Sequence, residues 1–81
     1  MIVYVKKWCP WCVEALGWLR ERNFDFEVVD VLADAEGYKR MQTISGQSLT
    51  PTLEMPDGEV LADFDVGQLE KFLEKRRGEG K

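Results

Sequence analysis

The sequence contains no histidine and only two cysteines among its 81 residues. Without an imidazole, no histidine is available to activate a nucleophile, which excludes catalysis of the cysteine–histidine kind. Two cysteines also supply only half of the roughly four Cys or His ligands of a tetrahedral zinc site. Only a dimer would complete such a site, so we expect no bound metal and no bound cofactor in the single chain.

Long apolar runs are also missing, since no stretch approaches the roughly 20 apolar residues that span a bilayer. The apolar start is interrupted at once by Lys6 and Lys7, so it does not resemble a signal peptide. A net charge of −4 disfavours nucleic acid as the main partner. We therefore expect a cytoplasmic monomer without a membrane or nucleic-acid partner. Its length predicts one domain over residues 1–78, followed by a frayed tail, 79–81.

Both cysteines lie in one box, Trp8-Cys9-Pro10-Trp11-Cys12, which follows the apolar run Ile2–Val5 and precedes the amphipathic segment Val13–Arg22. This order is typical of a strand, a turn and a helix, with Cys9 at the helix N-terminus. Free backbone N–H groups and the helix dipole favour a thiolate there, so we expect Cys9 to be exposed and acidic. Cys12, one turn on and more buried, is placed to resolve a mixed disulfide. The box closes too short a loop to be a useful structural disulfide. Chemistry as a thiol–disulfide oxidoreductase is therefore our first hypothesis.

The hydrophobic pattern predicts the order β-α-β-α-β-β-α. Strands are expected at Met1–Val5, Phe24–Val31, Thr52–Met55 and Glu59–Asp63, and helices at Val13–Arg22, Ala35–Thr43 and Val66–Arg77. Short links between the first three elements predict a right-handed βαβ unit with parallel strands. The turn Met55–Gly58 predicts an antiparallel hairpin. The fold class is α/β, with a four-stranded mixed sheet flanked by helices.

Local signals assign the helix ends and the inward faces. Asp34 and Asp65 are expected to cap the second and third helices, and Asn23 and Gly78 to end the first and third. Gly37 is expected to weaken the second helix. The residues expected to face inward are Val13, Ala15, Leu16 and Leu19, then Tyr38, Met41 and Ile44, then Leu69, Phe72 and Leu73. Trp8 and Trp11 are interpreted as a contact surface beside the thiol, and Trp18 as core or partly buried cover.

The stretches Lys6–Cys12 and Ser45–Pro51 together resemble a glutaredoxin of the thioredoxin fold, and the resemblance extends over nearly the whole chain. It implies that Cys9 is the nucleophile and Cys12 the resolving thiol. It also implies that Pro51 is a cis-proline facing the dithiol, with the backbone of Thr50 open to pairing with a substrate.

The same resemblance implies a binding site for a small thiol. Lys6 corresponds to a lysine that binds a carboxylate of glutathione, although from the residues alone a solvated charge is an equal alternative. Gln47 corresponds to a polar residue that assists glutathione binding. Trp11 replaces the tyrosine of the usual Cys-Pro-Tyr-Cys box and keeps an aromatic wall.

Two departures bear on which thiol is used. Leu49-Thr50-Pro51 replaces the common Thr-Val-Pro, and Ala62–Gly67 replaces the Gly-Gly-x-Asp motif that receives the γ-glutamyl end of glutathione. Phe64 adds bulk in that region, while Asp65 still offers a carboxylate at the helix start. The second half resembles mycoredoxins at least as well, so the co-substrate is glutathione or another low-molecular-weight thiol.

The sequence therefore predicts a dithiol oxidoreductase that reduces protein disulfides, or mixed disulfides of proteins with a low-molecular-weight thiol. Its partners would be disulfide-containing or thiolated proteins, and a small thiol or a flavoprotein reductase would restore it. Two alternatives stay open. One is a metal-binding or [2Fe–2S] cluster-binding module bridged by Cys9 of two chains, and the other is a thioredoxin-reductase-dependent electron donor to a reductase.

Overall fold

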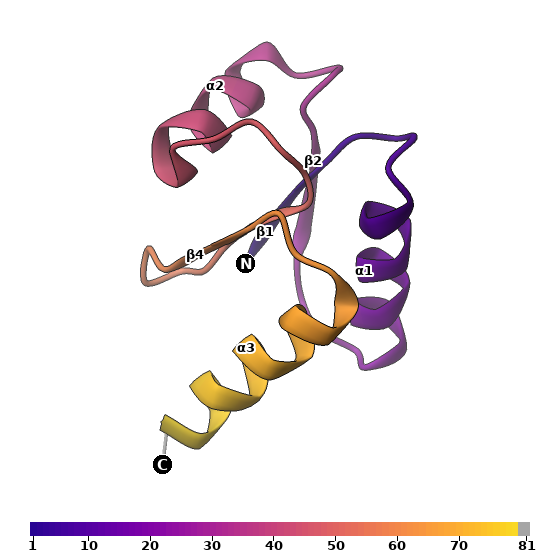
Figure 1. Ribbon diagram of the computed structural model, residues 1–81, viewed down its shortest axis with the longest axis vertical. Coiled ribbons are helices and arrows are strands. Elements are labelled where there is room, and N and C mark those ends of the chain that lie inside the picture. Colours follow the sequence, from indigo (N-terminus) through magenta and orange to yellow (C-terminus); the bar gives the residue numbers. More distant parts are fainter. Residues whose placement is uncertain (80–81) are drawn as a thin grey trace.

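The structure, a computed structural model, describes residues 1–79, with side chains through Arg77. Seven elements follow one another along the chain (Figure 1). They are β1 (Ile2–Val5), α1 (Pro10–Glu21), β2 (Glu27–Asp30), α2 (Ala35–Ser45), β3 (Thr52–Glu54), β4 (Val60–Ala62) and α3 (Val66–Glu79). The predicted order of strands and helices is confirmed.

The four strands form one mixed sheet in the order β2-β1-β3-β4. β1 pairs in parallel with β2 and antiparallel with β3, so that Val3 lies between Val28 and Leu53. β3 and β4 form the predicted hairpin, whose turn is closed by a hydrogen bond from the Gly58 amide to the Met55 carbonyl at 2.9 Å. The chain therefore has the α/β class and the thioredoxin-like sheet that the sequence predicts.

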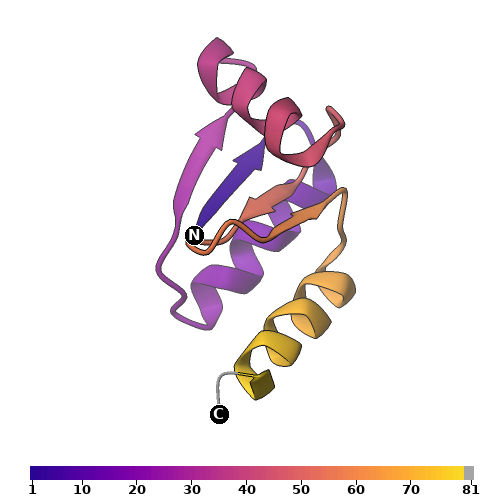
Figure 2. The same cartoon turned by 90° about the vertical axis from the view of Figure 1, so that its left-hand side faces the viewer.

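The helices cover both faces of the sheet, with α1 and α3 on one side and α2 on the other (Figures 1 and 2). Because side chains alternate along a strand, β1 sends Val3 and Val5 toward α1 and α3, and Tyr4 toward α2. The larger core on the side of α1 and α3 consists of Val3, Val5, Cys9, Cys12, Ala15, Leu19, Leu53, Phe64, Leu69 and Leu73. The central position of β1 explains why its sequence is apolar on both faces.

The inward faces agree with the predictions except at one residue of α1. Ala15 and Leu19 are fully buried and Leu16 is partly buried, but Val13 is 62% exposed, so its predicted inward position is wrong. The buried stripe begins at Cys12, and Val13 is rotated away from that stripe by about 100° of helical turn. The predicted inward residues of α2 and α3 lie against the two cores.

Several element boundaries differ from the predicted ones. α1 begins at Pro10, whose missing N–H is not needed in a first turn, and β2 covers only Glu27–Asp30 of the expected Phe24–Val31. α3 continues through Gly78 to Glu79, so Gly78 does not end it and Glu79 does not belong to a tail. Residues 80–81 of the predicted tail lie outside the described residues.

The two predicted N-terminal helix caps are present in the structure. The Asp34 carboxylate accepts a hydrogen bond from the Gly37 amide at 2.9 Å. At α3, Asp65 and Gln68 form a reciprocal capping box, because each side chain accepts from the other residue's backbone amide, at 2.8 and 3.0 Å. Asn23 has a φ of 60°, which suits the predicted end of α1.

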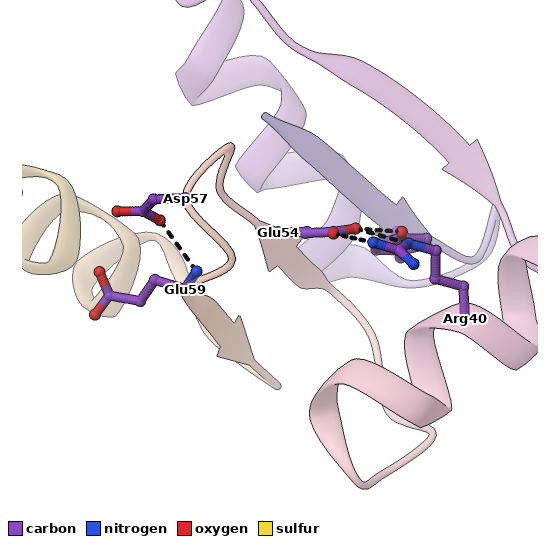
Figure 3. A network of polar contacts seen from close by, with 5 residues as sticks. Arg40, Glu54, Asp57 and Glu59 are labelled. Carbon is purple, nitrogen blue, oxygen red and sulfur yellow. Dashed lines mark hydrogen bonds and ion pairs between the residues drawn. The ribbon is translucent and has the colours of Figure 1, made fainter.

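Two polar networks fasten the helices to the sheet, and Figure 3 shows the first of them, in which Arg40 meets Glu54. The buried Tyr4 hydroxyl donates to Glu54 at 2.7 Å, and Arg40 of α2 donates to the same carboxylate. Burial and the Glu54 carboxylate raise the pKa of Tyr4 to about 12, while Arg40 and Tyr4 lower the pKa of Glu54 against the opposing effect of burial. In the second network, Arg76 of α3 binds the hairpin acids Asp57 and Glu59.

Within residues 1–79 no helix combines the length and the apolar character that a membrane span requires. The cytoplasmic location remains a prediction.

Candidate active site at the two cysteines

Cys9 is the N-cap of α1, so the first turn of the helix is built around its side chain. The Cys9 backbone is extended, and its Sγ accepts a hydrogen bond from the Cys12 amide at 3.3 Å. The Cys9 carbonyl accepts the first intrahelical bond from Val13 at 3.1 Å. A sulfur therefore occupies the place that a serine or aspartate oxygen usually takes at a helix start.

These hydrogen bonds make the two thiols unequal. Burial by itself would raise the pKa of Cys9, but hydrogen bonds from Cys12, Thr50 and the Trp11 backbone outweigh it, and the pKa of Cys9 is lowered. Burial raises the pKa of Cys12 to about 11, assisted by the hydrogen bond and the charge of Cys9. As the pH rises, Cys9 is therefore the first of the two to lose its proton.

Cys9 is less accessible than predicted. The residue is only 8% exposed, whereas an exposed sulfur was expected, and Cys12 is 1% exposed. The reason is the chain that precedes β3, because Sγ of Cys9 lies 3.7 Å from the carbonyl oxygen of Thr50. The predicted order of burial, with Cys12 deeper than Cys9, is confirmed.

Thr50 lies against Cys9, and it is followed by the cis-proline that the resemblance implied. The Thr50–Pro51 peptide bond is cis, and Pro51 is fully buried. The Pro51 carbonyl accepts from the Asp63 amide at 2.9 Å, which joins this segment to the end of β4. Among the backbone hydrogen bonds of residues 1–79 none is donated by the amide of Thr50, and the residue itself is buried.

Lys6 connects the loop before the cysteine box to the loop before β3. Its ammonium group donates to the Ser48 carbonyl at 3.2 Å and lies 5.7 Å from the Trp8 ring centroid and 5.9 Å from that of Tyr38. The ammonium has three N–H donors, so this arrangement leaves capacity for a further acceptor. The Lys6 carbonyl accepts a hydrogen bond from the Cys9 amide, so Lys6 lies near the dithiol. Its ammonium group is bonded to Ser48, so it is not the solvated charge that the sequence allowed as an alternative.

The Gln47 side chain forms hydrogen bonds with its own loop and with the start of β3. Its amide nitrogen donates to Ser45 Oγ at 2.9 Å and to Thr52 Oγ1 at 3.1 Å, while its oxygen accepts from the Leu49 amide. Thr52 Oγ1 in turn donates to the Leu49 carbonyl at 2.9 Å. Gln47 therefore shapes the segment that leads to Pro51.

The region that replaces the glycine motif differs from the expectation at Phe64. Its side chain is completely buried in the core beneath α1 and α3, so it does not add bulk at the surface. Asp65 lies at the start of α3 as predicted, but one of its carboxylate oxygens is occupied as the helix cap.

As predicted, Trp8 and Trp11 lie at the surface, and Trp18 packs against the core. Trp8 is 70% exposed and Trp11 is 44% exposed, on either side of Cys9 in sequence. Trp18 is partly buried and stacks on Phe24, with ring centroids 5.9 Å apart.

The structure adds three features near Cys9 that the sequence reasoning did not assign. Two of them, the Ser48 carbonyl and the Tyr38 ring, lie beside the Lys6 ammonium, and the third is Leu49, an exposed apolar residue directly before Thr50. Leu49 carried a usable signal, since it is the one apolar side chain in the loop between Gly46 and Pro51. The contacts of Ser48 and Tyr38 depend on the fold and had no local signal.

No cluster of three or more His, Cys, Asp or Glu side chains with metal-binding geometry occurs among the described residues. What the site offers is a thiol of lowered pKa and a thiol of raised pKa one helical turn apart, beside the backbone of Thr50. That arrangement is suited to exchange with a disulfide.

Comparison with known proteins agrees with this chemistry. The sequence model of the Glutaredoxin family matches residues 1–61. The chain is also 32% identical over 73 residues to an uncharacterized glutaredoxin-like 8.6 kDa protein in the rubredoxin operon of Clostridium pasteurianum. That alignment covers 90% of this chain and 96% of the relative.

Solved structures of thioredoxin-like proteins are also similar to this chain. The thioredoxin-like protein BC3987 superposes with a TM-score of 0.77 at 34% identity, covering 86% of this chain and 94% of that one. A mutant of the same protein gives a TM-score of 0.79 at 35% identity, with coverages of 89% and 96%. A glutaredoxin from Archaeoglobus fulgidus gives a TM-score of 0.74 at 22% identity, with coverages of 89% and 83%, and supports the fold alone.

Proposed function

The chain belongs to the glutaredoxin family, and from that premise we propose that it is a dithiol reductase of protein disulfides and of mixed disulfides between proteins and a low-molecular-weight thiol. Thiol–disulfide exchange is the chemistry of the family. The observation that carries the proposal for this chain is the asymmetry of the two thiols. The pKa of Cys9 is lowered, and that of Cys12 is raised to about 11.

In the first step, the Cys9 thiolate attacks one sulfur of the substrate disulfide. A bond forms between Cys9 and that sulfur, the substrate S–S bond breaks, and the other sulfur leaves as a thiolate that takes a proton from water. The Cys12 amide, 3.3 Å from Sγ of Cys9, stabilises the charge before attack. We propose that the backbone of Thr50, whose carbonyl lies 3.7 Å from Sγ of Cys9, pairs with the backbone of the substrate beside the sulfur.

In the second step, Cys12 loses its proton and attacks the sulfur of Cys9. The Cys9–Cys12 disulfide forms, the substrate sulfur leaves as a thiolate and is protonated, and two electrons have passed to the substrate. Loss of the negative charge from Cys9 in the first step removes one cause of the raised pKa of Cys12. Cys12 therefore becomes easier to deprotonate when its attack is required.

A reductant must then return two electrons to the Cys9–Cys12 disulfide. We propose a low-molecular-weight thiol, glutathione or another, with a flavoprotein reductase of the thioredoxin-reductase kind as the second source. Lys6 has donors left for a carboxylate of such a thiol, and we propose Trp11 and Asp65 as further contacts because the family resemblance implies them. A reducing compartment such as the cytoplasm is where this cycle would operate.

Two cysteine variants test the proposal. With a glutathionylated protein as substrate and glutathione as reductant, Cys9→Ser is expected to abolish turnover. Cys12→Ser is expected to keep much of it, because a glutathione thiolate can attack the mixed disulfide between Cys9 and glutathione in place of Cys12 and leave as glutathione disulfide. With an intramolecular protein disulfide, both thiols are needed and both variants are expected to fail. Equal loss of activity in the two variants with the glutathionylated substrate would overturn the step in which Cys9 acts alone.

One spectrum distinguishes the proposal from a cluster-binding module. Protein purified without oxygen is expected to be a monomer with no visible absorption and two titratable thiols per chain. Visible absorption with about two irons per dimer would instead assign Cys9 to a shared cluster.

A further inference from the structure

We propose that Lys6 is a positioning residue of the dithiol, because it holds the loop before β3 against the cysteine box and so keeps Thr50 beside Cys9. The inference rests on the proposed function and assigns this lysine a role within it. The observation that carries it is that Lys6 bonds to both segments. Its carbonyl accepts from the Cys9 amide at 3.1 Å, and its ammonium group donates to the Ser48 carbonyl at 3.2 Å.

The sheet does not extend to these two segments. The antiparallel ladder between β1 and β3 ends at the pair of Tyr4 and Thr52, so Cys9 and Thr50 both lie beyond it. Among the hydrogen bonds of residues 1–79, two join the segment 6–9 to the segment 46–50, namely the bond of Lys6 to the Ser48 carbonyl and the contact of Cys9 with Thr50. The contact of Cys9 is 3.7 Å long and involves a weakly bonding sulfur. The bond of Lys6 is therefore the stronger support for the distance between the two segments.

The ammonium group of Lys6 is held in place by two aromatic rings as well as by the carbonyl. It lies 5.7 Å from the Trp8 ring centroid and 5.9 Å from that of Tyr38, and both distances are within the range of a cation–π contact. Tyr38 comes from α2 and is partly buried against the core on that side of the sheet. The position of the ammonium group is therefore tied to α2 as well as to the two loops.

Lys7, the next residue in the chain, carries the same charge without these contacts. Its side chain is 84% exposed, and its ion-pair partner Asp30 lies 3.9 Å away. Lys6 in contrast is partly buried. An effect of charge alone on the dithiol should therefore appear at both lysines, whereas an effect of position should appear at Lys6.

The positioning role differs from the binding of a thiol carboxylate, which the family resemblance implies for Lys6. A carboxylate contact affects only those substrates that carry a carboxylate. The placement of Thr50 affects every disulfide that reacts at Cys9, because burial raises the pKa of this thiol and hydrogen bonding by Thr50 is among the contacts that lower it. A substrate without a carboxylate therefore separates the two roles.

The test uses two mixed disulfides of 2-thiopyridine, one with glutathione, which carries carboxylates, and one with 2-mercaptoethanol, which carries none. In a single turnover the Cys9 thiolate attacks the sulfur of the glutathione or mercaptoethanol part, a disulfide to Cys9 forms, and the pyridine sulfur leaves as the coloured pyridinethione. We expect Lys6→Met to lower both rate constants by a similar factor of about five, because a hydrogen bond contributes a factor of about 2 to 10. Lys7→Met is the matched control and should change each rate constant by less than about twofold.

Tyr38→Leu tests the same placement while the charge of Lys6 is kept. It removes one ring beside the ammonium group and should lower both rate constants, by less than Lys6→Met does, whereas Tyr38→Phe keeps the ring and should react like the wild type. The midpoint of Cys9 alkylation against pH should also rise more in Lys6→Met than in Lys7→Met. Thermal midpoints show that the variants are folded, and should Lys6→Met fail to fold, the two Tyr38 variants decide.

The outcomes separate the positioning role from the proposed function. A loss of rate confined to the glutathione probe would overturn the positioning role and make Lys6 a contact of the carboxylate. Equal losses in Lys6→Met and Lys7→Met, or no loss in either, would overturn it as well, and the reductase would stand in each of these cases. If the wild type reacts with neither probe faster than Cys9→Ser does, the reductase itself is contradicted, and the positioning role with it.

Discussion

The amide nitrogen of Cys12 lies 3.3 Å from Sγ of Cys9, so one half of the dithiol caps the helix that carries the other half. This single bond joins the fold to the chemistry. It satisfies a backbone donor at the start of α1 and stabilises the Cys9 thiolate at the same time. The burial of Cys12 that accompanies it keeps the second thiol protonated.

The difference between the thiols has a consequence for stability at alkaline pH. Because the pKa of Cys12 is raised to about 11 in the folded protein, the unfolded chain releases this proton first as the pH rises above about 9. The free energy of unfolding of the reduced protein should therefore fall by about 2 kcal/mol between pH 9 and 11. Urea unfolding with Cys12→Ala measures this, since the variant should lose less stability over the same interval. A parallel pH dependence in both proteins would contradict the assignment.

Gln47 is predicted to be a positioning residue for Thr50 and Pro51. Gln47→Ala should lower the free energy of unfolding by about 1–2 kcal/mol, because the Leu49 amide and Thr52 lose partners. It should also reduce kcat/KM by a similar factor with glutathionylated protein and with an intramolecular disulfide. A loss confined to the glutathionylated substrate, with unchanged stability, would instead make Gln47 a direct contact of the small thiol.

Gly37 is predicted to be required by packing, although it lies inside a helix. A Cβ at this position would lie 2.5 Å from Val29 Cγ1 and 3.0 Å from the capping carboxylate of Asp34. Gly37→Ala should therefore destabilise the protein despite the better helix propensity of alanine. Gly17 is the matched control on α1, where a Cβ meets no neighbour within 4 Å, so Gly17→Ala should add about 1 kcal/mol. Thermal unfolding of both variants decides the point, and a stabilised Gly37→Ala would refute it.

The network of Arg40, Glu54 and Tyr4 gives an acid-dependent prediction (Figure 3). The lowered pKa of Glu54 contributes stability above the ordinary carboxyl pKa, and this contribution is lost as the pH falls through the lowered value. Arg40→Met should therefore be less stable than the wild type at pH 7, with the difference vanishing in strong acid. Arg20→Met, at an exposed position of α1, is the control and should show no such pH dependence. A constant difference at all pH values would contradict the network.

The fold was predictable because its determinants are local. The apolar run of β1 and the Pro56–Gly58 turn are each readable in a few residues. So are the two aspartate caps, and the structure confirms both. The inward orientation predicted for Val13 was wrong, because the sequence does not show on which side of the buried stripe an apolar residue of a first helical turn lies.

The site was predictable only in outline. The position of Cys9 at a helix start and its proximity to Thr50 and Pro51 follow from the motif and the family resemblance. The burial of Cys9 and the bonding of Gln47 do not, because both depend on how the loop 46–50 folds against other elements. The same holds for Phe64, whose direction is decided by the core beneath α3.

The acidity of Cys9 is the claim on which the account depends most, and the rate of alkylation by iodoacetamide as a function of pH measures it directly. In the Cys12→Ala variant only one thiol reacts, and comparison with the wild type gives the contribution of the Cys12 side chain. We predict a midpoint for Cys9 of the wild type below the value of about 8.5 for a free cysteine, and a higher midpoint in Cys12→Ala, because one stabilising hydrogen bond is removed. A wild-type midpoint at or above that of a free cysteine, with an ordinary alkylation rate, would contradict the account.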